Sequence, residues 1–199
     1  GSTDGVIVAS KWAASIVKEN INSISVHVCP LGVDRTVFNE NNNSPSDVCD
    51  FLNCGKWEVR KGHDVLLRAF QSAFPTEQDV RLSMLPANPF LSPKEVSEWE
   101  VYYRSDSRVN IIDRRGTHAE VASVMNASTC GVFPSRAEGW NLELLEMMSC
   151  GKPVIATDYS AHTEFCTEDN SLLIDIDSLE RASDGKWFNG ELGEWASLE

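Results

Sequence analysis

The stretch that decides the fold is Glu138-Gly139-Trp140-Asn141-Leu142-Glu143-Leu144-Leu145-Glu146, which has an apolar segment on each side. Residues 129–133 precede it and residues 153–157 follow it, and both are typical of short buried strands. We expect a loop at the start of the stretch and a helix over 141–150, with Asn141 as the N-cap. A strand, a loop and a helix in this order place the helix N-terminus at the carboxyl edge of a parallel sheet, where α/β proteins bind ligands.

Strand and helix patterns alternate through the rest of the chain. Thr117 followed by Glu120 is a capping box that predicts a helix start, and the Asn-rich segment 39–46 predicts an exposed loop. Apolar periodicity predicts further strands and helices, with strands over 6–10, 25–29, 48–54, 80–85, 109–112 and 171–174, and helices over 11–20, 62–73, 93–103, 117–126 and 161–165. Repeated βα units predict an α/β fold, with a Rossmann-like, mainly parallel sheet and helices on both faces.

The composition restricts the classes of function. The chain has 199 residues, of which 42% are hydrophobic, and a net charge of −13. This length allows one sizeable core, and the charge argues against binding to nucleic acid or to an anionic membrane surface. No apolar run is long enough for a transmembrane helix. The 6 cysteines form no C-x-x-C pair, which favours free thiols in a reducing compartment, a cytoplasmic location and no metal site.

A second candidate site is the turn Gly55-Lys56-Trp57-Glu58-Val59-Arg60-Lys61-Gly62, which follows a predicted strand and opens a predicted helix. Lys56 and Lys61 bracket this turn, so we expect both ammonium groups over the carboxyl edge of the sheet. Two lysines in one pocket can neutralise a diphosphate without a metal ion. Arg60 is an alternative to either lysine, and a solvated basic turn is the alternative to a binding site.

The acidic residues of the opening stretch are candidates for contacts with hydroxyl groups. We expect Glu138 to accept hydrogen bonds from sugar hydroxyls and Glu146 from both hydroxyls of a ribose, a role for which Glu143 competes. Glu138 and Glu143 also have a structural interpretation, because a glutamate near a helix N-terminus complements the helix dipole. For Glu146 the structural alternative is a solvent-facing position on the helix. His162 follows the next strand and is a further candidate for lining the pocket. Backbone N–H groups at the helix start are expected to hold phosphate or sugar oxygens, and they belong to Gly139, Trp140, Asn141 and Leu142.

Three segments together resemble a known family. The stretch Glu138 to Glu146, followed by Gly151-Lys152-Pro153, looks like the E-x7-E region of retaining GT-B glycosyltransferases of the sucrose-synthase-like and mannosyltransferase-like type. The turn from Gly55 to Gly62 resembles their GR…KG segment, and Pro30-Leu31-Gly32-Val33-Asp34 resembles their P-N-G-V-D turn. The absence of G-x-G-x-x-G, a P-loop and a G-x-S-x-G elbow disfavours other α/β enzymes.

The resemblance implies a role for each candidate residue. Lys56 and Lys61 would hold the diphosphate of a nucleotide-sugar donor, Glu138 would contact the donor sugar and Glu146 the ribose. The strand end near Ile112 would pack against the base. The implied donor is a UDP- or GDP-sugar, the transfer retains the anomeric configuration, and neither a metal nor another cofactor is needed.

The chain departs from the family pattern at places that bear on the identity of the donor sugar. Lys56 stands where arginine is commoner, which replaces a bidentate fork by a point charge. Trp140-Asn141 replaces a frequent Phe-Gly pair, and Tyr159-Ser160-Ala161-His162 replaces a glycine-rich turn. We therefore expect the fold to match the family more closely than the sugar specificity does.

In this architecture a second, N-terminal domain binds most of the acceptor, a sugar or glycan. We therefore expect the chain to be the C-terminal half of such an enzyme and to transfer nothing alone, because one half cannot bring two substrates together. Its expected divisions are a linker region over 1–24, a nucleotide-sugar-binding domain over 25–174 and an acidic tail over 175–199. We expect any peripheral association with a membrane to be made through the missing domain.

Two further functions fit the same sequence. One is a noncatalytic nucleotide-binding or assembly module that kept the fold. The other is a sugar-phosphate phosphorylase or a nonhydrolysing epimerase, of which the first would require a cofactor lysine that the sequence does not identify.

Overall fold

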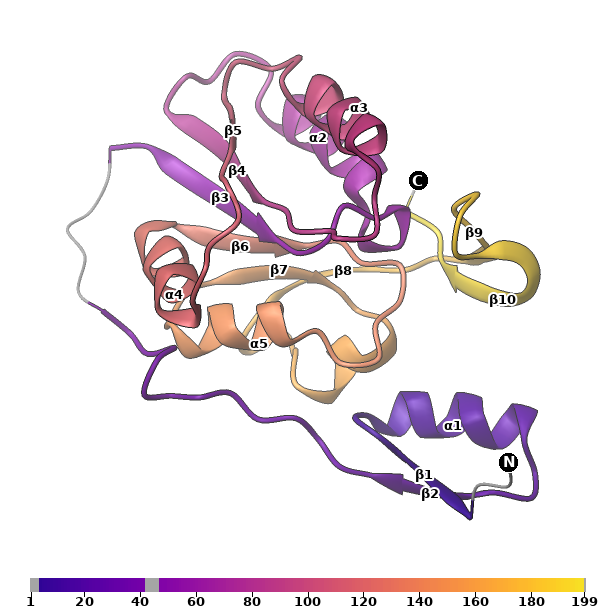
Figure 1. Ribbon diagram of the computed structural model, residues 1–199. Coiled ribbons are helices and arrows are strands. Elements are labelled where there is room, and N and C mark those ends of the chain that lie inside the picture. Colours follow the sequence, from indigo (N-terminus) through magenta and orange to yellow (C-terminus); the bar gives the residue numbers. More distant parts are fainter. Residues whose placement is uncertain (1–3, 42–46, 199) are drawn as a thin grey trace.

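A computed structural model of the chain describes residues 4–41 and 47–198. Six parallel strands form its main sheet in the order β5-β4-β3-β6-β7-β8 (Figure 1). Their apolar runs are typical of strands that are covered on both faces. The predicted Rossmann-like α/β class is confirmed. The strands are β3 (Cys49–Cys54), β4 (Val80–Leu85), β5 (Val109–Ile111), β6 (Cys130–Phe133), β7 (Val154–Thr157) and β8 (Leu172–Ile174).

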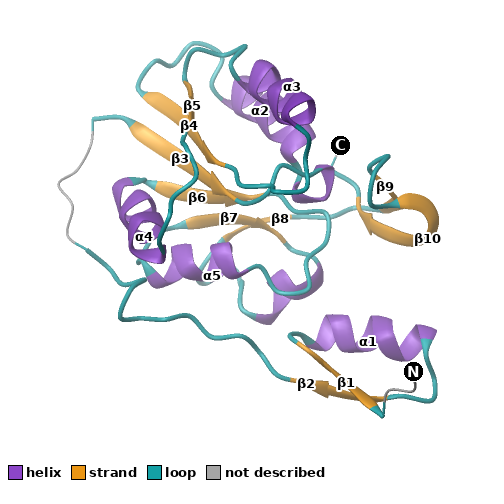
Figure 2. Ribbon diagram, viewed as in Figure 1, coloured by secondary structure: helices purple, strands orange, loops and turns teal. Residues whose placement is uncertain are grey.

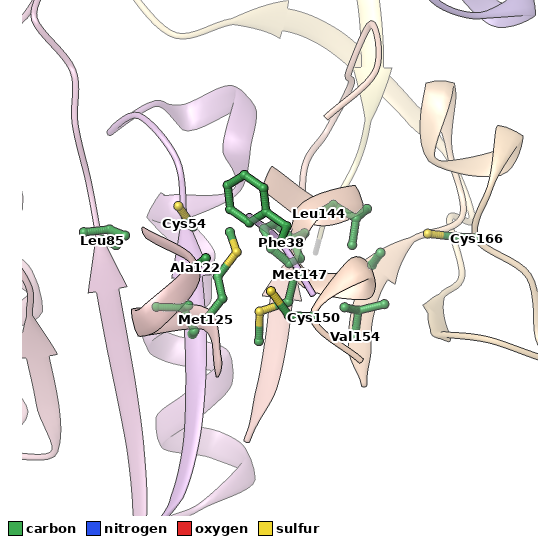
Figure 3. Packing of buried hydrophobic residues seen from close by; sticks show 13 residues of the cluster. Phe38, Cys54, Leu85, Ala122, Met125, Leu144, Met147, Cys150, Val154 and Cys166 are labelled. Atoms are coloured by element: carbon green, nitrogen blue, oxygen red, sulfur yellow. The ribbon is translucent and has the colours of Figure 1, made fainter. Parts of the chain in front are cut away.

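Helices cover both faces of this sheet, as Figure 2 shows. One face carries α2 (His63–Ala73) and α3 (Pro93–Tyr103), and the other carries α4 (His118–Ala127) and α5 (Leu142–Ser149). A separate apolar cluster lies under each pair of helices. The cluster under α4 and α5, drawn in Figure 3, includes fully buried Met125, Leu144 and Met147. This packing fixes α5, whose N-terminus faces the carboxyl edge of the sheet.

Capping boxes set the starts of α3 and α4, and the box at α4 was predicted. Thr117 Oγ1 accepts the N–H of Glu120, whose carboxylate in turn accepts the N–H of Thr117. Ser92 and Glu95 form a second capping box at α3. Both boxes satisfy backbone donors that a helix start otherwise leaves free.

The N-terminal region forms a small unit beside the main sheet. β1 (Gly5–Val8) pairs in parallel with β2 (Ser25–Val28), and α1 (Lys11–Asn20) connects them. The backbone N–H groups of Lys11 and Trp12 donate to the Glu164 carboxylate at 2.8 and 3.3 Å. Glu164 belongs to a short 3-10 helix, η2 (Ser160–Glu164), so this contact joins α1 to the loop after β7. Of the predicted loop over 39–46, residues 42–46 lie outside the described residues.

The acidic C-terminal segment, which shows no clear period in the sequence, forms an antiparallel hairpin. β9 (Leu179–Ser183) pairs with β10 (Asn189–Ala196), and the register shifts between Asn189 and Glu194. The Arg136 guanidinium bonds Glu180 at 3.1 Å and lies over the Trp195 ring. The hairpin is therefore anchored to the loop after β6.

Candidate functional site

The site lies where the strand order reverses. The crossovers after β3 and β6 go to opposite faces of the sheet, although these strands are neighbours, and open α/β sheets bind ligands at such a point. The two crossovers approach each other closely at Gly62, because this residue has no side chain. A Cβ there would lie 2.0 Å from Pro134 O. The φ of +74° at Gly62 also favours glycine. The Arg136 N–H donates to Arg60 O at 2.7 Å, which adds a direct bond between the crossovers.

Glu138 is the centre of a buried ion-pair cluster. Its Oε1 lies 3.0 Å from Lys61 Nζ, and its Oε2 lies 2.7 Å from Arg60 Nη1. Ser135 Oγ donates to Oε1 at 3.1 Å. Glu138 is only 8% exposed and Lys61 6%. The sequence therefore placed Lys61 and Glu138 correctly at one sheet edge, and the structure adds Arg60 as the second cation at the carboxylate.

Charge complementarity keeps this cluster ionised. Burial alone would raise the pKa of Glu138, but Lys61 and Arg60 outweigh it and lower the pKa to about 2. Burial likewise acts to lower the pKa of Lys61, while Glu138 and Glu143 raise it above its ordinary value. Both groups are charged at neutral pH. A charged ammonium group in a water-poor site can stabilise a developing negative charge strongly.

A cavity of about 190 Å³ lies beside this cluster and is locally positive. Lys56, Arg114 and Arg115 line it, against the single carboxylate of Glu143. Lys61 Nζ approaches the same place, since it lies 3.8 Å from Glu143 Oε2. The Lys56 side chain is exposed, and its Nζ lies over the Phe90 ring, 5.4 Å from the centroid. Lys56 thus borders the cavity from its solvent side, whereas Lys61 is buried at its inner side.

The α5 N-terminus is fixed by side chains. Asn141 has a φ of +79°, and its Oδ1 accepts the Leu144 N–H at 3.3 Å, which confirms the predicted N-cap. Asn141 Nδ2 lies 2.8 Å from His162 Nε2, and His162 Nδ1 lies 3.1 Å from Thr157 O. Because an amide nitrogen only donates, Nε2 accepts and the ring proton is on Nδ1. His162 is fully buried, so the expectation that it lines the pocket is wrong; it orients Asn141 instead.

The loop after β7 holds the main chain of Glu138 at two atoms. The Glu138 N–H donates to Ser160 Oγ at 2.9 Å, and Glu138 O accepts the Ala161 N–H at 3.2 Å. Ser160 itself has a φ of +57°, a conformation in which an L-residue is strained. Ser160, which was not predicted as a site residue, therefore positions the backbone of Glu138.

The remaining predicted contacts have different surroundings. Gly139 is exposed, and a Cβ there would meet nothing within 4 Å. The Trp140 ring is 9% exposed and packs on Phe165, so only its backbone remains a candidate for ligand contact. Leu142, the first residue of α5, is 38% exposed. Ile112 packs against the apolar cluster under α4 and α5, as does Val121, which lines the cavity that Lys56 borders.

Glu146 is half-buried on α5, one turn after Glu143. Burial and the nearby Glu143 carboxylate raise its pKa to about 7. A carboxyl group with this pKa changes its charge near neutral pH, so its capacity to accept hydroxyl hydrogen bonds depends on pH.

Arg114, Arg115 and Ser160 were not predicted as site residues. The two arginines follow β5 and its extension at Ile112, so their position after a predicted strand was a usable signal. For Ser160 the usable signal was its place in the segment from Tyr159 to His162, which stands where the family has a glycine-rich turn. No helix in the described part of the chain is both long and apolar enough to cross a bilayer.

Known proteins share both sequence and fold with this chain. Residues 49–184 match the family described as Glycosyl transferases group 1. A lipopolysaccharide core biosynthesis mannosyltransferase of Rhizobium meliloti is 30% identical over 141 residues, which are 67% of this chain and 39% of that protein. An uncharacterized glycosyltransferase of Methanocaldococcus jannaschii is 28% identical over 157 residues, 78% of this chain and 40% of that protein. The chain thus spans about 40% of the length of these relatives.

Solved structures agree on the fold. Sucrose-phosphate synthase from Thermosynechococcus elongatus superposes with a TM-score of 0.73 and 23% identity, over 87% of this chain and 46% of that one. Anabaena HepE in complex with UDP and glucose gives a TM-score of 0.68 and 20% identity, over 87% of this chain and 50% of that one. The family match covers more than half of the chain and includes both crossovers of the site. The chain belongs to the glycosyl transferases group 1 family, and its fold matches about half of each of these GT-B glycosyltransferase structures.

Proposed function

We propose that the chain is the donor-binding domain of a retaining glycosyltransferase that transfers a hexose from a UDP- or GDP-sugar to a sugar or glycan. The observation that carries the proposal is a locally positive cavity in a protein of net charge −13. This cavity adjoins the buried Lys61–Glu138 pair at the point where the strand order reverses.

The donor would extend across the two crossovers. Its base would occupy the cavity near Leu85 and Val121, which belong to the same apolar region as Ile112. Its diphosphate would lie among Lys61, Lys56 and the backbone N–H groups at the start of α5. The helix dipole and the fixed cations favour an anion there. Lys56, Arg114 and Arg115 give this region the positive charge that a diphosphate requires.

The sugar would lie at Glu138 and Gly139, on the side of the ion-pair cluster away from the base. Glu138 is fixed through both its side chain and its backbone, so it can orient sugar hydroxyls without rearranging. The departing diphosphate gains negative charge as the glycosidic bond breaks, and the buried Lys61 ammonium stabilises that charge. We propose that these side chains, and not a metal ion, neutralise the leaving diphosphate.

The acceptor would be bound mainly by a domain outside this chain. The chain corresponds to about 40% of its curated relatives, and transfer requires both substrates in one cleft. We therefore propose that the chain binds the donor by itself but transfers nothing without that second domain.

Calorimetry with UDP, GDP and ADP tests this proposal. We expect at least one nucleotide to bind, and we expect Lys61→Ala to abolish binding in a variant that circular dichroism shows to be folded. Lys94→Ala is the matched control, because its side chain is 87% exposed on α3. A folded wild-type chain that binds no nucleotide would refute the proposal. Nucleotide binding without transfer in the full-length protein would instead favour a noncatalytic module.

A further inference from the structure

The β9–β10 hairpin forms one side of a cavity of about 410 Å³ whose other side is the candidate sugar site. Glu138, Gly139 and Arg60 line the sheet side, and Phe188, Glu194 and Trp195 line the hairpin side. Figure 1 shows the hairpin beyond the carboxyl ends of the strands of the main sheet, and Trp12 of α1 also lines the cavity. β10 lies beyond residues 49–184, the part that matches the family. The hairpin side is therefore a feature that the family match does not explain.

Aromatic rings form the apolar part of this cavity. Phe188 and Trp195 contact each other edge to face, with ring centroids 5.4 Å apart. Phe188 is 37% exposed, whereas Trp195 is 2% exposed and supports it from below. Trp12 of α1 supplies a third ring and is itself held by an edge contact with Tyr159. Aromatic rings of this kind offer rigid apolar faces to a ligand.

Carboxylates supply the polar part. Glu194 is exposed at the hairpin side of the cavity, and Glu138 lines the sheet side with its carboxylate paired to Lys61 and Arg60. An ionised carboxylate accepts several hydrogen bonds from hydroxyl groups. A rigid aromatic face with a few acceptors is the composition expected of a pocket for a neutral, hydroxyl-rich ring.

The hairpin is held firmly against the site. Arg136, two residues before Glu138, bonds Asp64 with both terminal nitrogens at 2.7 and 2.9 Å and also bonds Glu180 of β9. The Ala196 N–H donates to Arg136 O at 2.9 Å, and Trp195 Nε1 donates to Glu180 Oε1 at 3.0 Å. The aromatic wall therefore has a fixed distance from the Glu138 loop.

We infer that this wall is an acceptor subsite, which binds a pyranose ring of the sugar that receives the transferred hexose. The inference rests on the proposed function, because only that function places the donor sugar at Glu138. A ring that stacks on Phe188 and bonds Glu194 faces the donor sugar across the cavity. Part of the acceptor specificity is thus encoded in this domain, and the occupant is uncharged and hydroxyl-rich.

Saturation-transfer NMR tests the inference on the whole chain. The protein is first saturated with whichever of UDP or GDP calorimetry shows to bind, and methyl α-D-mannopyranoside and methyl α-D-glucopyranoside are then titrated. We expect one of them to bind saturably. Phe188→Ala and Glu194→Gln should each weaken that binding by about fivefold or more. The nucleotide affinity should stay within a factor of about two of the wild-type value.

Trp187→Ala is the matched control. Trp187 is the neighbour of Phe188 and is 49% exposed, but it lines a different cavity with Trp99 and Tyr102. Equal glycoside affinities in the Phe188, Glu194 and Trp187 variants would overturn the inference, as would no saturable glycoside binding to the loaded wild type. A parallel loss of nucleotide affinity in Phe188→Ala would assign the hairpin to the donor instead. If no nucleotide binds at all, the proposed function fails first.

Discussion

Replacing Lys61 by methionine tests whether the ion pair at the centre of the site has the strength that its burial implies. Methionine has a similar length and no charge, so Lys61→Met removes the cation and keeps most of the packing. Glu138, which is 8% exposed, is then left with Arg60 as its cation at 2.7 Å. Loss of one partner of a buried ion pair is costly, because it leaves a buried charge less compensated.

The expected magnitude follows from the pKa of Glu138. The fall from 4.5 to about 2 corresponds to about 3 kcal/mol at ~1.4 kcal/mol per tenfold change in the acid dissociation constant. Lys61 and Arg60 produce this fall together, and Lys61 is the larger contributor. Lys61→Met should therefore lower the free energy of unfolding at pH 7 by about 2–3 kcal/mol.

Denaturant unfolding at several pH values is the assay. A lowered pKa stabilises the fold above the unfolded value of 4.5, and this contribution is lost as the pH falls through about 2. The wild type should consequently lose more stability than Lys61→Met over that interval, and the two curves should converge in acid.

Lys56→Met is the control, because the exposed Lys56 lies in the same turn and should change the free energy of unfolding by less than about 0.5 kcal/mol. If Lys61→Met is as stable as Lys56→Met at pH 7, the buried pair does not stabilise the fold by the expected amount. A constant difference between wild type and Lys61→Met down to pH 2 would contradict the assignment to Glu138.

Three further predictions concern other parts of the site. The affinity for a sugar nucleotide should fall as the pH decreases through 7, since Glu146 gains a proton there. Calorimetry should show that the affinity of Glu146→Gln does not change with pH over this range. If the variant keeps the pH dependence of the wild type, Glu146 does not bind the ribose. Ser160→Ala should lower the unfolding free energy by about 1 kcal/mol, because it removes the hydrogen bond to the Glu138 N–H. Ser160→Gly should be nearly neutral in the same denaturant assay, because glycine also relieves the backbone strain. Equal losses in the two variants would show that the backbone of Ser160 is not strained. Arg136→Leu should cost about 2 kcal/mol and speed hydrogen exchange in β10, and protected β10 amides would show that the hairpin is held by other contacts.

The sequence predicted the sheet and its helices well because their signals are local. Apolar runs mark β3, β6 and β7, and Thr117 with Glu120 marks a helix start through contacts three residues apart. Parallel strands bring the crossovers after β3 and β6 to one edge, so Lys61 and Glu138 could be placed together before any distance was known.

Features that depend on distant contacts could not be predicted in this way. Arg60 points to Glu138 although it lies next to Lys61, because Ala137 O and Glu58 orient its guanidinium. The sequence of the hairpin shows no regular alternation of apolar and polar residues, because the strand register shifts between Asn189 and Glu194. Its position depends on Arg136, more than 40 residues earlier.

The most direct test of the central claim is a crystal structure of the chain with the nucleoside diphosphate that calorimetry selects. The account predicts phosphate oxygens within hydrogen-bond distance of Lys61 Nζ, in the cavity that Lys56 and Arg114 line. A diphosphate bound elsewhere, with Lys61 still paired only to Glu138 and Glu143, would contradict it.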